Sequence, residues 1–279
     1  MKKRGLSKER KIFNKISKDI KEIKIQGARN IAKKALYAYS LVPTESSIEK
    51  LISLRPTEPM LVNVLKKVKT QPSTKITLHF DEAQQKINKI VLELIKNGDI
   101  IYTHCHSTNV TGALIYAKKN GKKFEVYNTE TRPLFQGRKT AVELRKEGIK
   151  VTMFVDSAMD VALSKNERTK KVSKILLGAD ALLKKGVINK IGSGVIGKLS
   201  RANKIPLYII ADSWKYSSKP VKIEERDFHE VWANIPKKSK IKIENPAFEF
   251  LRKKYITKIV TELGMLSYRK FLRIVKNNF

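Results

Sequence analysis

The residues best suited to chemistry lie in one short stretch, THCHST at 103–108. It places the only cysteine of the chain, Cys105, between His104 and His106, directly after an apolar run at 100–102. A thiol acts as a base or nucleophile when its pKa is lowered, and a helix N-terminus or a nearby cation can lower it. The alternative is a buried apolar cysteine, the commoner fate of a lone thiol, although two polar histidines are odd neighbours for a core residue. A metal site is disfavoured, because successive strand residues point to opposite faces.

A carboxylic acid and an anion site are also available. Asp180 closes an apolar run at 175–179, where burial would raise its pKa and keep it protonated as a general acid. Asn189 and Lys190 precede a Gly-Ser turn at 192–193 that is expected to open a helix and to hold a phosphate on its backbone amides. A thiol, a carboxylic acid and an anion site suit proton transfer on a phosphorylated sugar. Further candidate anion contacts are Arg55, Arg132, Gln136 and Arg138.

The elements that must position these residues follow from the pattern of the chain after Gly98. Short apolar runs alternate there with amphipathic segments, which predicts βαβ units and a mostly parallel sheet covered by helices on both faces. The expected strands are 100–102, 123–128, 150–155, 173–177 and 206–211, and the expected helices are 108–119, 139–147, 157–165 and 193–203.

Polar residues follow each of these strands, among them Cys105, Glu130, Asp156, Asp180 and Asp212. In open parallel sheets the ligand crevice lies beyond the carboxyl ends of the strands, so we expect these residues to converge on one rim. The alternative for each residue taken alone is a helix N-cap, which is the usual task of Asp and Ser at such a position.

The first third of the chain has a helical pattern instead. Isoleucines recur at spacings of three and four along 12–23, and a second apolar series at 87–95 follows Asp81, which we expect to cap that helix. A chain of 279 residues can bury a sizeable core and can hold a small domain joined to a larger one. The predicted fold is therefore α/β, with a small N-terminal helical domain at 1–97 and an α/β domain at 98–279.

The charge of the chain is strongly positive, with 59 Lys and Arg against 26 Asp and Glu and a formal net charge of +33. Such a balance attracts polyanions, including RNA, membranes and phosphorylated small molecules. Most of the excess is lysine scattered through every segment, which can also reflect a hot habitat, and no aromatic and arginine pattern typical of RNA-binding surfaces is visible. We therefore expect no specific nucleic-acid partner. The basic stretch at 269–276 is predicted to be a solvated or subunit-contacting helix.

Cysteine content and hydropathy limit the class of protein further. A single cysteine excludes an intrachain disulfide, and no CxxC or HxxxH spacing indicates a structural zinc site. The longest apolar runs are too short to cross a bilayer, and the N-terminal MKKRGLSKERK lacks the apolar region of a signal peptide. These features predict a cytoplasmic protein with no membrane partner.

Several blocks of residues resemble one family along nearly the whole chain. In order they are IQGARNIAKKA, RPTEP, THCHS, TETRPLFQGRKTAVEL, GIKVTMFVDSA, GAD, INKIGS, NPAFEF and ITKIVTELG. Together they resemble the initiation factor 2B-like superfamily over residues 20–265. That superfamily joins the regulatory subunits of eukaryotic translation initiation factor 2B to two sugar-phosphate isomerases, methylthioribose-1-phosphate isomerase and archaeal ribose-1,5-bisphosphate isomerase. The resemblance implies that the α/β domain is Rossmann-like.

The resemblance also implies roles for individual residues. The family isomerases carry a catalytic cysteine in the THC block and a catalytic aspartate in the GAD block, which match Cys105 and Asp180, whereas the regulatory subunits typically lack this pair. The THCHS form is more similar to ribose-1,5-bisphosphate isomerase. The implied reaction converts α-ribose 1,5-bisphosphate to ribulose 1,5-bisphosphate in archaeal AMP salvage, with Cys105 as base and Asp180 as acid. The implied substrate-binding residues are Gln26, Gly27, Ala28, Arg55, Arg132, Gln136, Asn189, Lys190, Asp212 and Lys215.

One of these positions departs from the family pattern, since Gln26 stands where the family motif has arginine. The resemblance implies no metal or other cofactor, a homo-oligomer (a dimer or hexamer), and AMP as an activator. The sequence alone shows no self-complementary surface. The alternatives are a noncatalytic regulatory or binding protein of the same family, a methylthioribose-1-phosphate isomerase, and a polyanion-binding protein that uses the +33 charge.

Overall fold

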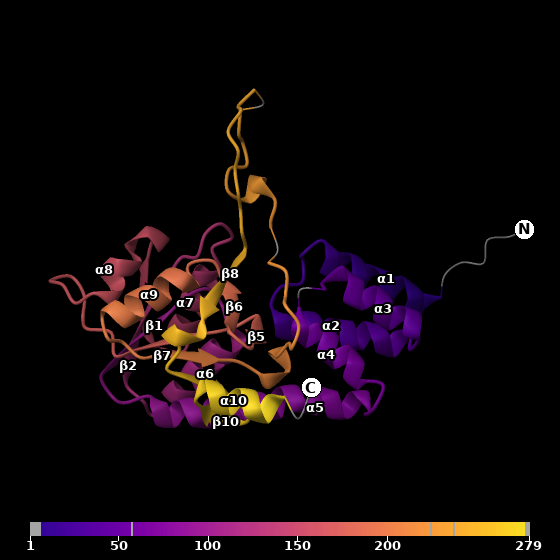
Figure 1. Ribbon diagram of the computed structural model, residues 1–279, viewed down its shortest axis with the longest axis horizontal. Helices are drawn as coiled ribbons and strands as arrows, with labels where there is room; N and C mark the ends of the chain where they lie inside the picture. The colour runs from indigo at the N-terminus through magenta and orange to yellow at the C-terminus, as the bar shows by residue number, and fades with distance from the viewer. Residues whose placement is uncertain (1–6, 57, 224, 237, 277–279) are drawn as a thin grey trace, which may run out of the picture.

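The computed structural model describes residues 7–56, 58–223, 225–236 and 238–276 (Figure 1). The first six residues of the basic N-terminal stretch and Thr57 of the RPTEP block lie outside the described residues. Its N-terminal part is a group of helices, and its larger part is a sheet with helices on both faces, as predicted. None of the described helices is long and apolar enough to cross a membrane.

The helices of the N-terminal group pack around a small apolar core. They are α1 (Lys8–Lys21), α2 (Ala28–Leu41), α3 (Glu45–Leu54) and α4 (Pro59–Lys67). Ser7 and Thr44 cap α1 and α3 through their side chains, and Pro59 occupies the first turn of α4, where its missing N–H costs nothing. The predicted isoleucine series lies within α1 as far as Ile20. The helix ends at Lys21, however, and Ile23 has a positive φ in the turn that follows.

Helix α5 (Ser73–Leu94) begins earlier than the sequence indicated. Asp81 was expected to cap this helix; it lies in its middle instead and forms an ion pair with Arg29 of α2 at 2.7 Å. The expectation was wrong because α5 extends on the N-terminal side of Asp81 as far as Ser73, directly after Pro72. Phe80 packs into the helical group and Val91 into the core beneath the sheet, so α5 links the two parts. The division at residue 97 stays a prediction.

The main sheet has seven strands in the order β10-β9-β7-β4-β1-β2-β3. Their bounds are β1 (Asp99–Thr103), β2 (Phe124–Thr129), β3 (Lys150–Phe154), β4 (Lys174–Leu177), β7 (Leu207–Ile210), β9 (Lys258–Thr261) and β10 (Gly264–Leu266). All neighbours pair in parallel except β9 and β10. The five expected strands are therefore confirmed, and their carboxyl ends lie at one edge of the sheet.

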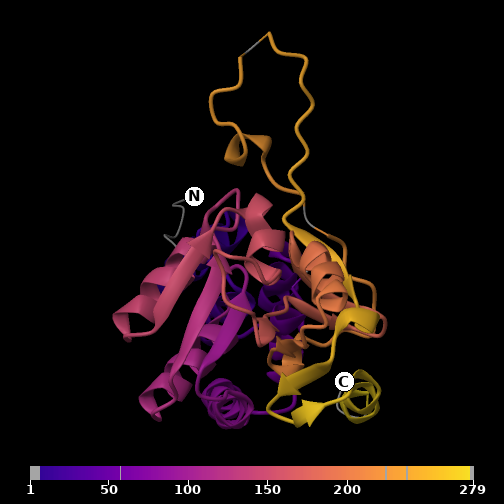
Figure 2. The same ribbon diagram turned by 90° about the vertical axis from the view of Figure 1, so that its left-hand side faces the viewer.

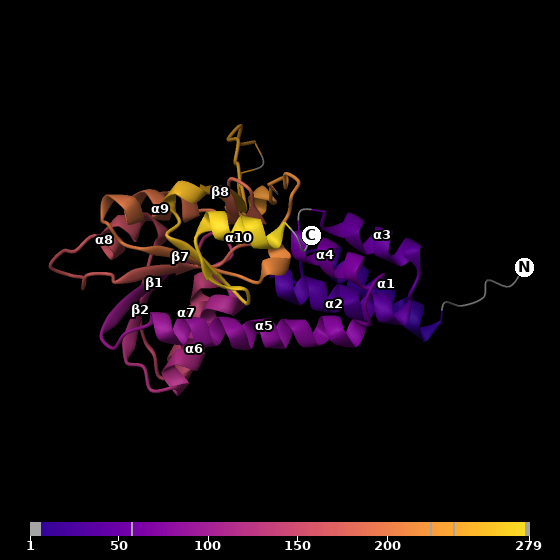
Figure 3. The same cartoon turned by 60° about the horizontal axis from the view of Figure 1, so that its bottom comes forward.

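Helices cover both faces of this sheet (Figure 3). One face carries α5, α6 (Thr108–Lys119) and α7 (Gln136–Lys146), and the other carries α8 (Met159–Leu163), α9 (Ser193–Ala202) and α10 (Tyr268–Val275). Adjacent strand residues serve opposite cores: Ile101 packs with the first set and Tyr102 with the second. The basic tail helix α10 is exposed on one side, but its Phe271 and Val275 are buried in this chain's own core.

Two C-terminal features have no counterpart in the sequence prediction. A small antiparallel sheet, β5-β6-β8, consists of β5 (Ala181–Leu183), β6 (Gly186–Lys190) and β8 (Phe248–Arg252). Between β7 and β8 the chain also forms a long excursion, residues 217–244, here called the arm. Its first residues line a hollow with Pro59 and Val62 of α4, and its described outer part projects well away from the body (Figures 1 and 2).

Candidate active site

Cys105 lies in a tight turn directly beyond the carboxyl end of β1. Its backbone has a positive φ of 67°, a conformation that a non-glycine residue adopts only when its surroundings impose it. Two threonines hold this turn: the Cys105 amide donates to Thr131 Oγ1 at 3.0 Å, and Thr140 Oγ1 donates to the Cys105 carbonyl at 2.8 Å. The thiol is therefore placed by contacts from the segments that follow β2.

The two neighbouring histidines face different surroundings. His104 is buried, with its ring nitrogens against Thr129 Oγ1 and, at 2.8 Å, the Ile191 carbonyl. Burial lowers the pKa of His104, so this ring is neutral at physiological pH and supports the turn. His106 instead contacts Glu143 of α7 at 3.0 Å between its Nε2 and the carboxylate.

The electrostatic state of Cys105 differs from the sequence expectation. We expected a lowered thiol pKa, but burial raises the pKa of Cys105 to about 11. The Lys190 charge opposes this increase, whereas the charges of Asp180 and Asp156 add to it. Ser107 caps α6 directly after this turn, and the N-terminus of a helix favours a nearby negative charge. The cost of placing a thiolate out of water is larger than the favourable effects of the helix and of Lys190.

Asp180 follows β4 and lies beside the cysteine turn. Its amide donates to the Ile188 carbonyl at 2.9 Å, and a Cβ on nearby Gly178 would come within 2.6 Å of Ser107 Oγ. Glycine is therefore required where the GAD segment passes the THCHS segment. From the third strand end, Lys215 donates to the Ala179 carbonyl at 2.6 Å. Three strand ends thus meet at one point of the rim, as expected.

A cavity of about 160 Å³ opens between this rim and the helical group. It brings together most of the residues implied by the sequence: Gln26, Gly27, Ala28, Arg55, Cys105, Gln136, Asp180, Asn189, Lys190 and Lys215. The buried Oε1 of Gln136 has no hydrogen-bond partner among the described residues. Arg55 pairs with Glu58 at 3.1 Å, both of them buried at the cavity wall.

Arg132 and Asp212 lie outside this cavity lining. Arg132 packs its guanidinium over the Phe135 ring and donates to the Val231 carbonyl at 3.0 Å. Its backbone amide, like that of Thr131, donates to the Asp156 carboxylate, which shows that Asp156 holds the loop after β2.

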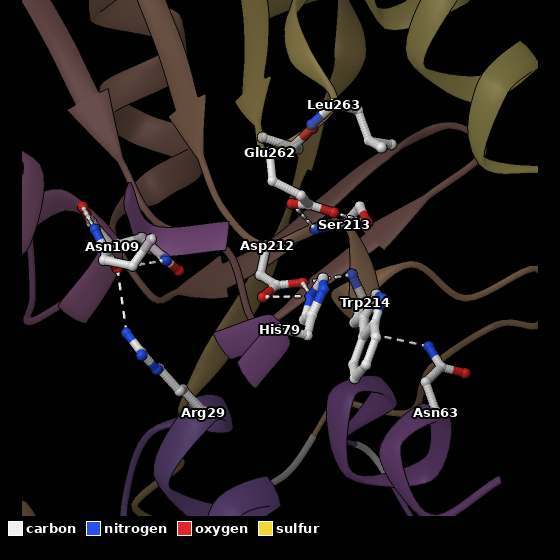
Figure 4. Close-up of polar contacts among 11 residues, drawn as sticks. Arg29, Asn63, His79, Asn109, Asp212, Ser213, Trp214, Glu262 and Leu263 are labelled. Carbon is white, nitrogen blue, oxygen red and sulfur yellow. Dashed lines mark hydrogen bonds and ion pairs between the residues drawn. The ribbon is translucent and has the colours of Figure 1, made fainter. Parts of the chain in front are cut away.

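Asp212 belongs to a polar cluster behind Lys215 (Figure 4). Its carboxylate accepts from the Trp214 amide at 2.8 Å and contacts His79 Nε2 at 3.1 Å, and the His79 ring stacks on Trp214 with centroids 3.6 Å apart. Glu262 accepts from the Ser213 amide and hydroxyl, and burial beside Asp212 raises the pKa of Glu262. The cluster therefore fixes the short turn that presents Lys215 to the cavity.

The predicted phosphate cradle at the start of α9 is occupied by a side chain. Glu249 of β8 accepts from the Gly192 amide at 2.5 Å, and a Cβ on Gly194 would lie 2.4 Å from its carboxylate. This expectation was wrong, because an acid distant in sequence takes the place of the anion. The N-terminus of α2 is a second place where backbone amides could hold an anion. Its N-cap residue is Gly27, which has a φ of 84° and no capping side chain, and a Cβ at this position would have no atom within 4 Å.

Comparison with known proteins gives the context for this geometry. A family model described as the initiation factor 2 subunit family matches residues 20–268. The chain belongs to the initiation factor 2 subunit family. The predicted resemblance is therefore confirmed.

Among relatives of this family, a ribose 1,5-bisphosphate isomerase of Methanocaldococcus jannaschii is 33% identical and covers 97% of this chain and 96% of its own length. A methylthioribose-1-phosphate isomerase of Fervidobacterium nodosum is 29% identical over 91% of this chain and 86% of its own. The crystal structure of Pyrococcus horikoshii translation initiation factor eIF-2B superposes with a TM-score of 0.79 at 26% identity, covering 94% of this chain and 98% of that one.

Several residues that line the cavity of this initiation factor 2 family protein could not be predicted from the sequence. Arg226 arrives from the base of the arm and pairs with Glu230 at 2.5 Å, and Phe248 of β8 lies under Lys190 Nζ at 4.7 Å. Lys139 and His106 also line the cavity. The neighbours of His106 gave a weak signal, but nothing in the sequence around Arg226 or Phe248 indicates that these segments fold back onto the strand ends.

Proposed function

We propose that the protein is an aldose-ketose isomerase that converts α-ribose 1,5-bisphosphate to ribulose 1,5-bisphosphate, as a step of AMP salvage. The observation that carries this proposal is the placement of Cys105 and Asp180 on one cavity whose other walls are cationic or offer free amides. The relative of Methanocaldococcus jannaschii, named for ribose 1,5-bisphosphate, supports the choice of substrate.

The two groups divide the proton transfers between them. Asp180 protonates the ring oxygen as its bond to C1 breaks, and Cys105 removes the proton from C2 to give a C1–C2 enol whose C1 oxygen still carries the phosphate. Protonation at C1 and loss of the C2 hydroxyl proton then give the ketone, so protons gained and lost balance over the cycle. This chemistry needs one protonated acid and one deprotonated base at the same time.

The coupling between the two groups favours that state. The Asp180 charge is one of the causes that raise the thiol pKa of Cys105, so a proton on Asp180 removes this opposition and favours the thiolate. The Lys190 charge lowers the same pKa. Protonation of Asp180 and the charge of Lys190 therefore act in the same direction on the thiol of Cys105.

Anion binding in the cavity has two sources. The uncapped N-terminus of α2 at Gly27 presents backbone amides, which offset the charge lost where Gln26 replaces arginine. Lys190 and Lys215 supply cations from the opposite, α/β side, and Arg226 supplies one from the base of the arm. A ribose bisphosphate can place one phosphate at the α2 N-terminus and the other at the cations of the α/β side. A methylthioribose monophosphate has one phosphate only, so its apolar methylthio group would face one of these two anion sites.

A comparison of two substrates tests the proposal. Purified protein is expected to convert α-ribose 1,5-bisphosphate at least about a hundredfold faster, in kcat/KM, than methylthioribose 1-phosphate, because a misplaced apolar group leaves two or more cations unpaired. A preference for the monophosphate would establish the activity named for the Fervidobacterium nodosum relative instead. Turnover of neither compound would favour a noncatalytic regulator.

The same proposal includes a homo-oligomer, a dimer or hexamer, with AMP as an activator. The structural neighbours include a tetrameric complex of initiation factor 2B subunits at a TM-score of 0.70, whose 14% identity shows a shared fold only. Light scattering with and without AMP is the direct measurement of assembly.

A further inference from the structure

The proposed isomerisation requires a third proton transfer, at the hydroxyl group on C2. Cys105 can return its proton to C1, and Asp180 has given its proton to the ring oxygen. The ketone forms only when the C2 hydroxyl also loses its proton, so a further base is needed at this oxygen. Histidine is the side chain best suited to accept and release a proton near neutral pH.

Two histidines of the described chain line the cavity, His104 and His106. Both ring nitrogens of His104 are engaged, one with Thr129 and the other with the Ile191 carbonyl. The ring of His106 makes one hydrogen bond, from Nε2 to Glu143, and its Nδ1 has no hydrogen-bond partner among the described residues. His106 is therefore the cavity histidine that has a ring nitrogen left for a ligand.

The backbone of His106 is in contact with the thiol. Burial raises the pKa of the Cys105 thiol, and the Lys190 charge and a hydrogen bond from the His106 backbone oppose this increase. The His106 side chain is 12% exposed, so the ring lies against the cavity wall and does not extend into solvent. Consecutive Cα atoms are about 3.8 Å apart, so the thiol and the imidazole can act on neighbouring atoms of one bound sugar.

Glu143 determines which ring nitrogen of His106 can accept a proton. A carboxylate only accepts hydrogen bonds, so in the neutral ring Nε2 carries the proton and donates to Glu143 at 3.0 Å, which leaves the lone pair on Nδ1. Once Nδ1 has taken a proton, the ring is a cation beside a carboxylate, and this pairing stabilises it. An acid that orients an imidazole and stabilises its charged form is typical of bases that act on hydroxyl groups.

One face of α7 supplies the partners of this turn. Gln136, Lys139 and Glu143 follow one another at spacings of three and four, which places them on the same side of the helix. Gln136 and Lys139 line the cavity, and Thr140 of the same face donates to the Cys105 carbonyl at 2.8 Å. The helix therefore holds the thiol and the imidazole against the same cavity.

We propose that His106, oriented by Glu143, is the base that removes the proton from the C2 hydroxyl of the enol, an inference that rests on the proposed isomerase activity. The O–H bond breaks as its proton goes to Nδ1, and the electron pair of that bond forms the C2=O double bond. The electron pair of the C1–C2 double bond takes the thiol proton of Cys105 and forms the new C1–H bond. The imidazolium returns its proton to the Asp180 carboxylate through solvent, which restores all three groups.

The fate of the C2 proton in D2O, followed by NMR, separates this role from a structural one. In His106→Gln, Cys105 still removes the proton from C2, but the enol lacks its base and returns to α-ribose 1,5-bisphosphate more often. We expect kcat to fall about a hundredfold or more, with KM changed by less than about threefold. We also expect the ratio of deuterium at C2 of the recovered substrate to ketose formed to increase about tenfold or more, because the enol persists while the thiol exchanges with solvent.

A second variant and a matched control complete the experiment. Glu143→Gln keeps an acceptor for Nε2 and removes only the charge that stabilises the imidazolium, so its kcat is expected to lie between those of the wild type and His106→Gln, with the deuterium ratio again increased. The control, His229→Gln, removes an exposed imidazole paired with Asp227 at 2.8 Å on the arm and is expected to change neither quantity. Circular dichroism checks the fold of each variant, and if His106→Gln does not fold, the ratio in Glu143→Gln decides.

The outcomes distinguish this step from the isomerase activity on which it rests. Ketose formation by the wild type, with an unchanged deuterium ratio in His106→Gln and Glu143→Gln, would overturn the role of His106 and leave the Asp180 carboxylate as the acceptor of the proton. An increased ratio in His106→Gln alone would overturn the part assigned to Glu143. No ketose formation by the wild type would instead refute the isomerase activity itself, and with it this step.

Discussion

At the scale of single residues, the site is determined by what surrounds Cys105 rather than by its sequence neighbours. His104 and His106 suggested a cysteine with a lowered pKa, yet His104 is buried and directed away to Ile191. The charge that lowers the thiol pKa belongs to Lys190, eighty-five positions along the chain, and a hydrogen bond from the His106 backbone lowers it further. Such an effect depends on three-dimensional placement, so residue types could identify the thiol but could not give its protonation state.

Alkylation of this thiol tests its electrostatics. Because Cys105 is the only cysteine, iodoacetamide modification reports on it alone. With a pKa raised to about 11, the thiolate fraction increases about tenfold with each pH unit up to that value, so the alkylation rate is expected to increase steadily from neutral pH to about pH 10. A plateau below about pH 9 would contradict the buried environment.

A substitution separates the contribution of Lys190. Removing its charge in Lys190→Met raises the thiol pKa further, so alkylation is expected to become slower at every pH below the midpoint. Lys254→Met removes an exposed lysine of the same chain and is the matched control, with no expected change.

At the scale of elements, the strands and helices that carry the site could largely be predicted from apolar periodicity. The parallel order follows from alternation, and of the five strand-end residues expected to converge, Cys105 and Asp180 line the cavity. Glu130, Asp156 and Asp212 lie outside its lining. The start of α5 and the role of the α9 N-terminus could not be predicted. Apolar periodicity predicts where a helix runs, but it does not predict that Glu249, 57 residues after Gly192, accepts a hydrogen bond at the N-terminus of that helix.

One buried ion pair within the sheet tests the packing of these elements. Lys174 at the start of β4 pairs with Asp99 at the start of β1, and both are buried. Lys174→Met leaves the Asp99 charge without its partner, which is expected to lower the free energy of unfolding by about 3–5 kcal/mol in urea denaturation. The control is Lys150→Met, which breaks an exposed pair with Glu125 and is expected to cost less than about 1 kcal/mol. Equal costs for the two would contradict the buried pair.

At the scale of the whole molecule, the candidate site depends on parts that lie far apart along the chain. Gln26 and Arg55 come from the helical group, Cys105 and Asp180 from the sheet, and Arg226 from the arm. The composition indicated attraction to polyanions, including phosphorylated small molecules, and lysine and arginine side chains line the cavity. The arm could not be predicted, because its residues form almost no regular structure and its surface pattern exists only in three dimensions.

The central claim is that Cys105 and Asp180 together move protons on a ribose bisphosphate. We would incubate the protein with α-ribose 1,5-bisphosphate in D2O and follow ribulose 1,5-bisphosphate formation and deuterium at C1 by NMR, alongside Cys105→Ser and Asp180→Asn. The account predicts ketose formation by the wild type, with deuterium appearing at C1 to the extent that the abstracted proton exchanges with solvent, and a loss of rate of about a thousandfold or more in each variant. Comparable turnover by Cys105→Ser, or no turnover by the wild type, would contradict it.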